Sequence, residues 1–132
     1  MSGKLIPPNG EKPTHGNCKA RLTAVGDAIY AIGGKWKLRI IVALSEGPKR
    51  FNELQRLVEG VSARVLSAEL KDMELNGFVS RKIDTGIPVI VEYQLTDYSD
   101  TLQDVLQALG NWGANHRERI KNDIRNSMQV AN

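Results

Sequence analysis

A three-residue turn between two short amphipathic segments constrains this chain more than any other feature of its sequence. The turn, Glu59–Val61, separates residues 49–58 from residues 62–77. Its central glycine tolerates the left-handed backbone that a steep connection between helices requires. Ser62 then suits an N-cap, and Asn76-Gly77 suits the end of a helix. We therefore predict two helices joined at a steep angle, the helix-turn-helix arrangement.

The second of these helices has two distinct faces. Leu66, Leu70 and Met73 recur at i, i+4 and i+7, which gives an apolar stripe for packing against a core. Another face carries small, hydroxylic or cationic side chains: Ala63, Arg64, Ser67 and Lys71. Glu69 and Asp72 fall on the flank, so the N-terminal half of this face can approach phosphates without repulsion. The pattern predicts a recognition helix that lies in a nucleic-acid groove.

The rest of the chain adds further helices and a β-hairpin. The predicted elements are a helix over 18–32 ended by Gly33-Gly34, a largely apolar helix over 35–46 ended by Gly47-Pro48, the helix over 49–58, strands over 78–83 and 89–95, and a long last helix capped by Thr96. This order is typical of a winged helix-turn-helix domain, a mainly α fold with a small β-hairpin. We expect a flexible N-terminal arm (1–16), the winged domain with its dimerisation helices (17–115) and a C-terminal helical extension or tail (116–132).

Apolar stripes on the first and last helices predict a homodimer. A small helical core with a hairpin would not cover both stripes, and Gly110 and Gly113 permit close approach between helices. The expected interface residues are Leu22, Val25, Ile29, Leu102, Val105, Leu109 and Trp112.

Composition narrows the class of protein. A hydrophobic fraction of 41% with 25% charged residues is ordinary for a globular domain, and 132 residues make one domain. No apolar run is long enough to span a bilayer and no signal peptide is visible, so we expect a cytoplasmic protein without membrane contact. The single cysteine excludes an internal disulfide framework.

Net charge does not by itself nominate a DNA-binding surface. Lys and Arg outnumber Asp and Glu by seven to three in residues 1–46, equal them at seven each in 47–96, and fall short by four to five in 97–132. The net charges of these segments are therefore +4, 0 and −1. The case for DNA must rest on where individual charges lie on a helix face.

Short motifs found in order along the chain resemble one known family. They are Gly34-Lys35-Trp36, Gly47-Pro48 with Arg50-Phe51 and Glu53-Leu54, Leu66 with Leu70, Asn76-Gly77-Phe78-Val79 with Arg81, then Pro88, Val91-Glu92-Tyr93 and Leu95-Thr96. From Cys18 to about Trp112 the chain resembles the HxlR-type branch of the MarR-like bacterial winged-helix regulators. The resemblance implies a homodimeric DNA-binding transcription regulator that dimerises through its first and last helices. A winged helix that binds protein, without sequence-specific DNA binding, is the alternative.

Three positions depart from the pattern of that family. Lys19 follows Cys18 where proline is frequent, and Ser99 replaces a usual glycine in the opening turn of the last helix. Ile90 stands where a basic residue is frequent, and Asp84 lies near the hairpin tip. We therefore expect the hairpin to contribute less to minor-groove binding than it does in the family.

The residues expected to bind double-stranded DNA fall into three groups. Arg64, Ser67 and Lys71 would contact base edges in the major groove. Ser62 and Ala63 would bring the helix N-terminus close to a phosphate. Flanking phosphate contacts are expected from Lys49, Arg50, Arg81 and Lys82. The alternatives are a merely solvated face, cations that serve solubility and, for Arg81, a stem that lies over apolar surface.

Two interpretations apply to Cys18. It stands at the start of the first helix beside Lys19 and Arg21, where the helix dipole and the cations favour the reactive thiolate. The family resemblance implies that a cysteine at this place can be a redox or electrophile sensor. The other interpretation, which the sequence alone favours, is an unreactive thiol packed against the dimer partner.

Enzymatic and cofactor sites are not predicted. Gly33-Gly34-Lys35 lacks the partners that a phosphate-binding loop needs, because Ile29 replaces a glycine and Trp36 replaces a hydroxyl. No Ser, His and acid cluster suggests a catalytic triad, and His15, His116 and one cysteine do not make a metal site. The aromatic residues fit a core better than an effector pocket, and none of them identifies a small-molecule effector: Tyr30, Trp36, Phe51, Tyr98 and Trp112.

Overall fold

The computed structural model describes residues 15–130 of the chain. In chain order its elements are α1 (His15–Ile32), α2 (Lys37–Leu44), α3 (Phe51–Leu57), α4 (Ala63–Leu75), β1 (Val79–Asp84), β2 (Ile90–Leu95), the 3₁₀ helix η1 (Asp97–Leu102) and α5 (Gln103–Val130). The expected N-terminal arm lies outside the described residues, except for His15 and Gly16, which already belong to α1. The C-terminal segment from residue 116 continues α5 without a break.

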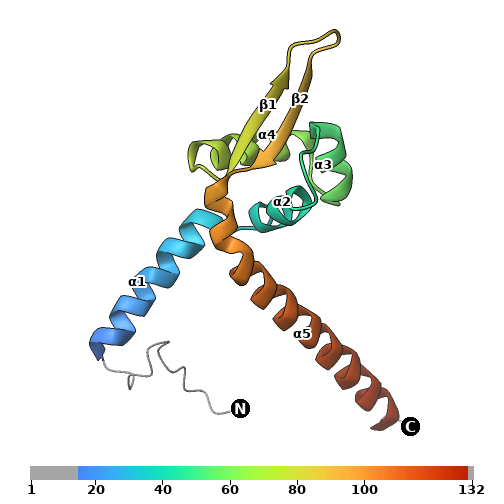
Figure 1. The fold of residues 1–132 in the computed structure, drawn as a ribbon. Coiled ribbons are helices and arrows are strands. Elements are labelled where there is room, and N and C mark those ends of the chain that lie inside the picture. The colour runs from blue at the N-terminus through green and yellow to red at the C-terminus, as the bar shows by residue number, and fades with distance from the viewer. Residues whose placement is uncertain (1–14, 131–132) are drawn as a thin grey trace.

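The helix-turn-helix and the hairpin form one body, from which α1 and α5 extend as separate helices. Figure 1 shows α2, α3 and α4 gathered near the base of the β1–β2 hairpin, while α1 and α5 diverge on the side opposite the hairpin tip. The mainly helical fold with an antiparallel hairpin, predicted from the sequence, is confirmed.

Glycines end the segments of the helix-turn-helix as predicted. Gly60 has φ of +90° in the turn between α3 and α4, and Gly77, which follows the C-cap Asn76 of α4, has φ of +82°. An L side chain rarely adopts this backbone conformation, which explains why glycine stands at both positions. Ser62 is the N-cap of α4, because its hydroxyl accepts a hydrogen bond from the Val65 N–H at 3.2 Å.

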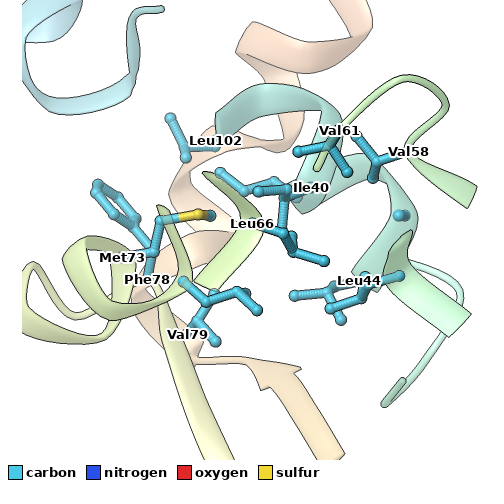
Figure 2. Packing of buried hydrophobic residues seen from close by; sticks show 13 residues of the cluster. Ile40, Leu44, Val58, Val61, Leu66, Met73, Phe78, Val79 and Leu102 are labelled. Carbon is cyan, nitrogen blue, oxygen red and sulfur yellow. The ribbon is translucent and has the colours of Figure 1, made fainter. Parts of the chain in front are cut away.

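One face of each short helix builds the core. Ile40, Ile41 and Leu44 of α2 are buried, so this helix is central as expected, although it begins at Lys37 rather than Lys35. The apolar stripe of α4 belongs to the same core cluster, in which Figure 2 shows Leu66 beside Ile40 of α2 and Met73 beside Phe78. Further core side chains come from α3, the turn before α4, the start of β1 and the end of η1: Leu54, Val58, Val61, Phe78, Val79 and Leu102.

The hairpin has a regular antiparallel register from Val79 opposite Leu95 to Asp84 opposite Ile90. A third backbone segment joins it at Lys49, whose N–H donates to the Tyr93 carbonyl at 2.9 Å and whose carbonyl accepts from the Tyr93 N–H at 2.7 Å. This bridge fixes the start of α3 against the hairpin.

The predicted cap at Thr96 needs a correction. Thr96 precedes the 3₁₀ helix η1 and makes no side-chain cap, because its hydroxyl donates instead to the Gly77 carbonyl. The hydroxyl of Ser99, which is buried, likewise donates to the Phe78 carbonyl at 2.6 Å. A glycine at position 99 could not make this second bond. Both bonds tie η1 to the junction of α4 and β1.

The aromatic residues divide between core and surface. Trp36 and Phe51 pack against the core as expected. The same expectation is wrong for Tyr30 and Trp112, because they lie on α1 and α5, which leave the body and have little to pack against. Tyr98 is also exposed, although its ring stacks on Phe78 with centroids 5.3 Å apart.

Candidate nucleic-acid interface

The face of α4 that the sequence assigns to DNA is open to solvent. Arg64, Ser67 and Lys71 are all exposed, whereas Leu66 and Leu70 on the opposite side are fully buried. A helix turns by 100° per residue, so the three exposed side chains lie within about a 60° arc of its surface. The structure therefore brings these three predicted residues together.

The N-terminus of α4 is also exposed. Ser62 and Ala63 are both solvent-accessible, and the Ser62 oxygen already accepts the Val65 N–H. The Ser62 hydroxyl hydrogen remains a donor, since a hydroxyl can accept and donate at the same time. Together with the backbone N–H groups of the first turn it can approach an anion.

The acidic side chains of α4 are paired with cations from other elements. Lys37 of α2 lies with its ammonium nitrogen 3.0 Å from the Glu69 carboxylate and 3.2 Å from that of Asp72. Arg81 of β1 places its Nε 3.1 Å from Glu74 Oε1. By contrast, neither Arg64 nor Lys71 makes an ion pair with any residue between 15 and 130.

The charged form of Lys37 is favoured by its position. Partial burial of the ammonium opposes the charge, but hydrogen bonds and Coulomb attraction from Glu69 and Asp72 outweigh it and raise the pKa of Lys37 above 10.5. Lys37 is therefore a permanent cation at neutral pH. Sequence reasoning did not single it out, because nothing in the spacing of positions 37, 69 and 72 reports a contact between two helices.

Polar residues of α3 line a shallow depression on the surface of the helix-turn-helix. A space of about 510 Å³ is lined by Asn52, Gln55, Arg56 and Val61. Asn52 and Arg56 are exposed at i and i+4, on the side of α3 away from buried Leu54. Sequence reasoning named none of these polar residues as candidates, although their helical spacing was a usable signal. Arg50, the N-cap of α3, is exposed, and its N–H donates to Glu53 at 3.0 Å.

The remaining predicted cations differ in how available they are. The Lys49 side chain is only 19% exposed and its ammonium lies 3.5 Å from Glu46, so it offers less to a phosphate than its position in the sequence suggests. Arg81 is half-exposed but shared with Glu74. Lys82 is exposed and stands opposite Glu92 in the hairpin register.

The hairpin tip carries no cation. Asp84 Oδ1 accepts the Gly86 N–H at 3.1 Å, which folds the carboxylate back onto the turn. Ile87 and Val89 beside it are exposed. The tip therefore combines apolar side chains with a carboxylate and is not basic.

The residues expected at a dimer interface are exposed with one exception. Leu102 is 9% exposed and lies in the core of its own protomer, because η1 is tied against the α4–β1 junction, so we no longer assign it to the interface. The other six are exposed on α1 and α5: Leu22, Val25, Ile29, Val105, Leu109 and Trp112. The stripe on α5 continues through Ile120, Ile124 and Met128, which are also exposed. Cys18 is a free, exposed thiol in the first turns of α1.

Comparison with known proteins identifies the family of this winged helix. The sequence model of the HxlR-like helix-turn-helix family matches residues 31–121. The chain belongs to this family. Its members are DNA-binding transcription regulators and not enzymes, which confirms the expected class. Among the described helices, none has the length and apolar character needed to cross a bilayer.

Individual family relatives agree with this assignment. The HTH-type transcriptional regulator YtcD of Bacillus subtilis is 37% identical over 100 residues, which cover 76% of this chain and 79% of that protein. A MarR-family regulator from Enterococcus faecalis has a structure that matches with a TM-score of 0.66 at 36% identity, over 77% of this chain and 93% of that one. The redox regulator HypR in its oxidized form matches with a TM-score of 0.67 at 34% identity, over 70% of this chain and 95% of that one.

Proposed function

We propose that this chain is a cytoplasmic, homodimeric regulator that binds a pseudo-palindromic operator, with the helix of residues 62–76 in the major groove. The observation that carries the proposal is the exposed face of α4, on which Arg64, Ser67 and Lys71 lie together. Arg64 and Lys71 can donate to guanine, and Ser67 can donate to or accept from several bases.

The other predicted contacts would position the protein on the duplex. The first turn of α4, with Ser62 and Ala63, would meet a phosphate through its N–H groups. Arg50 and Lys82 are the exposed flanking cations, and they would contact phosphates on either side of the groove. Lys49 and Arg81 are lesser candidates for this task, because each is already paired with a carboxylate.

Dimerisation would follow from the apolar faces of α1 and α5. A 28-residue helix is about 42 Å long, and α5 exposes apolar side chains along most of it. Burial against a second copy would remove these side chains from water and generate two-fold symmetry. The two α4 helices would then contact half-sites about one helical turn apart, ~34 Å, or a multiple of it.

A salt titration tests DNA binding. Binding of a fluorescent mixed-sequence duplex is measured by anisotropy between about 50 and 200 mM salt. If the dimer neutralises six to ten phosphates, affinity falls by roughly 10³- to 10⁵-fold over this range. Absence of binding at the lowest salt would overturn the proposal in favour of a protein-binding winged helix.

We further propose that Cys18 makes DNA binding sensitive to oxidation. Its thiol is exposed beside Lys19 and near Arg21, and HypR, whose structure matches this chain, is a redox regulator. Because the chain has a single cysteine, a disulfide can form only with a second copy or with an external thiol. Diamide would accept the two electrons and two protons released when two thiols join.

The test compares the wild type and Cys18→Ser with and without diamide. We expect the oxidant to change DNA affinity in the wild type alone, and dithiothreitol to restore the original value. Mass spectrometry identifies the product as a disulfide between copies or with a small thiol. Equal affinities with and without diamide in the wild type would remove Cys18 as a switch.

A further inference from the structure

The recognition helix α4 has a negative net charge, which opposes binding to DNA. Between Ala63 and Leu75 it carries two cations, Arg64 and Lys71, and three acids, Glu69, Asp72 and Glu74, so its formal charge is −1. Carboxylates near a duplex repel its phosphates. A helix of this composition can bind DNA only if its carboxylates are kept away from the phosphates or are paired with cations.

Cations from neighbouring elements pair with the carboxylates of α4. Lys37 reaches from α2 to both Glu69 and Asp72, and its side chain is only 16% exposed. That burial leaves Lys37 poorly placed to contact a phosphate itself. At the C-terminal end of α4, Arg81 of the hairpin pairs with Glu74, whose side chain is 26% exposed.

On α4 the acidic side chains are in ion pairs and the basic side chains are not. All three acids of the helix are paired with a cation from outside it, while both of its own cations are unpaired within residues 15–130. Adding Lys37 and Arg81 to the five charges of α4 changes the local sum from −1 to +1. The two unpaired cations, Arg64 and Lys71, lie on the exposed face, while the flank keeps one negative charge in excess.

We propose that Lys37 is a positioning residue for DNA binding: it holds the carboxylates of Glu69 and Asp72 against α2 and offsets one of their two charges. Arg81 holds the Glu74 carboxylate against β1 and offsets its charge. The inference rests on the proposed placement of α4 in the major groove. It assigns Lys37 to the DNA-binding machinery without any contact with DNA, and it gives Arg81 a task other than phosphate binding.

Two other roles for Lys37 make different predictions. If Lys37 bound a phosphate directly, its removal would cost the same affinity whether or not Glu69 and Asp72 were charged. If it served stability alone, its removal would lower the unfolding midpoint without changing the DNA affinity of the folded protein. A double-mutant cycle between Lys37 and the two acids separates these roles.

The cycle uses four proteins: wild type, Lys37→Met, the double variant Glu69→Gln with Asp72→Asn, and the triple variant that combines them. Affinity for a mixed-sequence duplex is measured by anisotropy at about 50 mM salt, where phosphate repulsion is least screened. We expect Lys37→Met to weaken binding roughly tenfold in the wild-type background and less than about twofold in the amide background. Lys37→Arg, which keeps the charge, should bind within about twofold of wild type.

Controls separate the inference from general effects. Lys121→Met removes a lysine paired with Glu118, 3.6 Å away, so it makes the same change in net charge on α5, a helix that extends away from the body containing α4. We expect it to leave DNA affinity within about twofold of wild type. Circular dichroism checks that each variant is folded at the assay temperature. Should Lys37→Met not fold, the double variant still tests the inference, because without repulsion it must bind at least as tightly as wild type.

The outcomes distinguish this inference from the proposed function. Failure of the wild type to bind the duplex would remove the DNA-binding proposal and the inference with it. Binding by the wild type, with an equal loss from Lys37→Met in both backgrounds or no loss in either, would overturn the role of Lys37 alone. Weaker binding by the double variant than by wild type would also overturn it.

Discussion

Arg64 is the residue on which base discrimination should depend most. It is the exposed, unpaired arginine nearest the N-terminal end of α4, the end that enters deepest when such a helix lies in the major groove. A bidentate contact from arginine to guanine contributes about 1–3 kcal/mol of discrimination. Arg64→Ala should therefore relax sequence preference at one position of each half-site.

The measurement is a selection of bound duplexes from a randomised pool, followed by affinities for the preferred sequence and a single-base variant. Lys82→Ala is the matched control, because it removes one exposed cation from the hairpin instead of the helix face. That control should weaken binding to all sequences about equally and reduce the salt slope by about 1 for each protomer, or about 2 for the dimer. Unchanged discrimination in Arg64→Ala would exclude base contact by this residue.

Ser62 should matter for stability as well as for phosphate approach. Its hydroxyl satisfies the Val65 N–H in the first turn of α4, and an alanine would leave that group without its cap. Ser62→Ala is expected to lower the free energy of unfolding by about 1 kcal/mol. Ser62→Asp, which can still cap the helix, is expected to keep most of the stability that Ser62→Ala loses. Urea unfolding at fixed protein concentration measures both; equal midpoints for wild type and Ser62→Ala would contradict the cap.

At the scale of single elements, much of the helix-turn-helix follows from sequence, because its ends are set by local chemistry. Gly60, Ser62 and Gly77 determine the turn and the bounds of α4 within a few neighbouring residues. The contact of Lys37 with Glu69 joins positions 32 apart in sequence and depends on how α2 and α4 pack. Periodicity within one helix does not report a contact with another helix. The position of Glu69 on the flank of α4 could therefore be predicted, but its pairing with Lys37 could not.

The α2–α4 ion pairs also predict a dependence of stability on pH. Because the pKa of Lys37 is raised in the folded protein, its contribution is complete below about 10.5 and is lost as pH rises through the raised value. Near neutral pH, we expect the free energy of unfolding of wild type to exceed that of Lys37→Met by roughly 1 kcal/mol or less, since solvent partly screens the ion pairs.

Urea unfolding of the two proteins across the alkaline range tests this dependence. The difference between them should be constant up to about pH 10 and shrink toward pH 12. Comparison of the pair cancels the titration of tyrosines and other lysines, which both proteins share. A difference that stays constant through the alkaline range would show that the Lys37 charge does not stabilise the contact between α2 and α4.

At the scale of the whole molecule, the environment of the apolar faces on the two long helices, α1 and α5, could not be predicted from the sequence. Amphipathic spacing correctly predicted apolar faces on α1 and α5, but it could not tell a face that packs within the protomer from one left exposed. Leu102 and Leu109 belong to the same apolar series and end in different environments, one buried and one exposed. The difference arises because the hydroxyl of Ser99 ties η1 to the body, whereas α5 extends away from it.

The exposed face of α5 gives the last prediction. Leu109→Arg places a charge in the middle of the apolar stripe, where burial against a second copy would leave it unpaired. We expect this variant to be a monomer at micromolar concentration in a sizing column with light scattering, while wild type is a dimer. Its affinity for the selected operator should fall at least about tenfold, because the two half-sites are no longer bound by one linked molecule.

Gln107→Arg provides the matched control for this variant. Gln107 is exposed on the same helix, about 160° around it from Leu109, so the same substitution there adds the same charge outside the stripe. It should remain dimeric and keep operator affinity. A wild type that is monomeric at these concentrations would overturn the homodimer and its two-fold operator. A Leu109→Arg variant that stays dimeric would place the dimer contact elsewhere and would change the expected spacing of the half-sites.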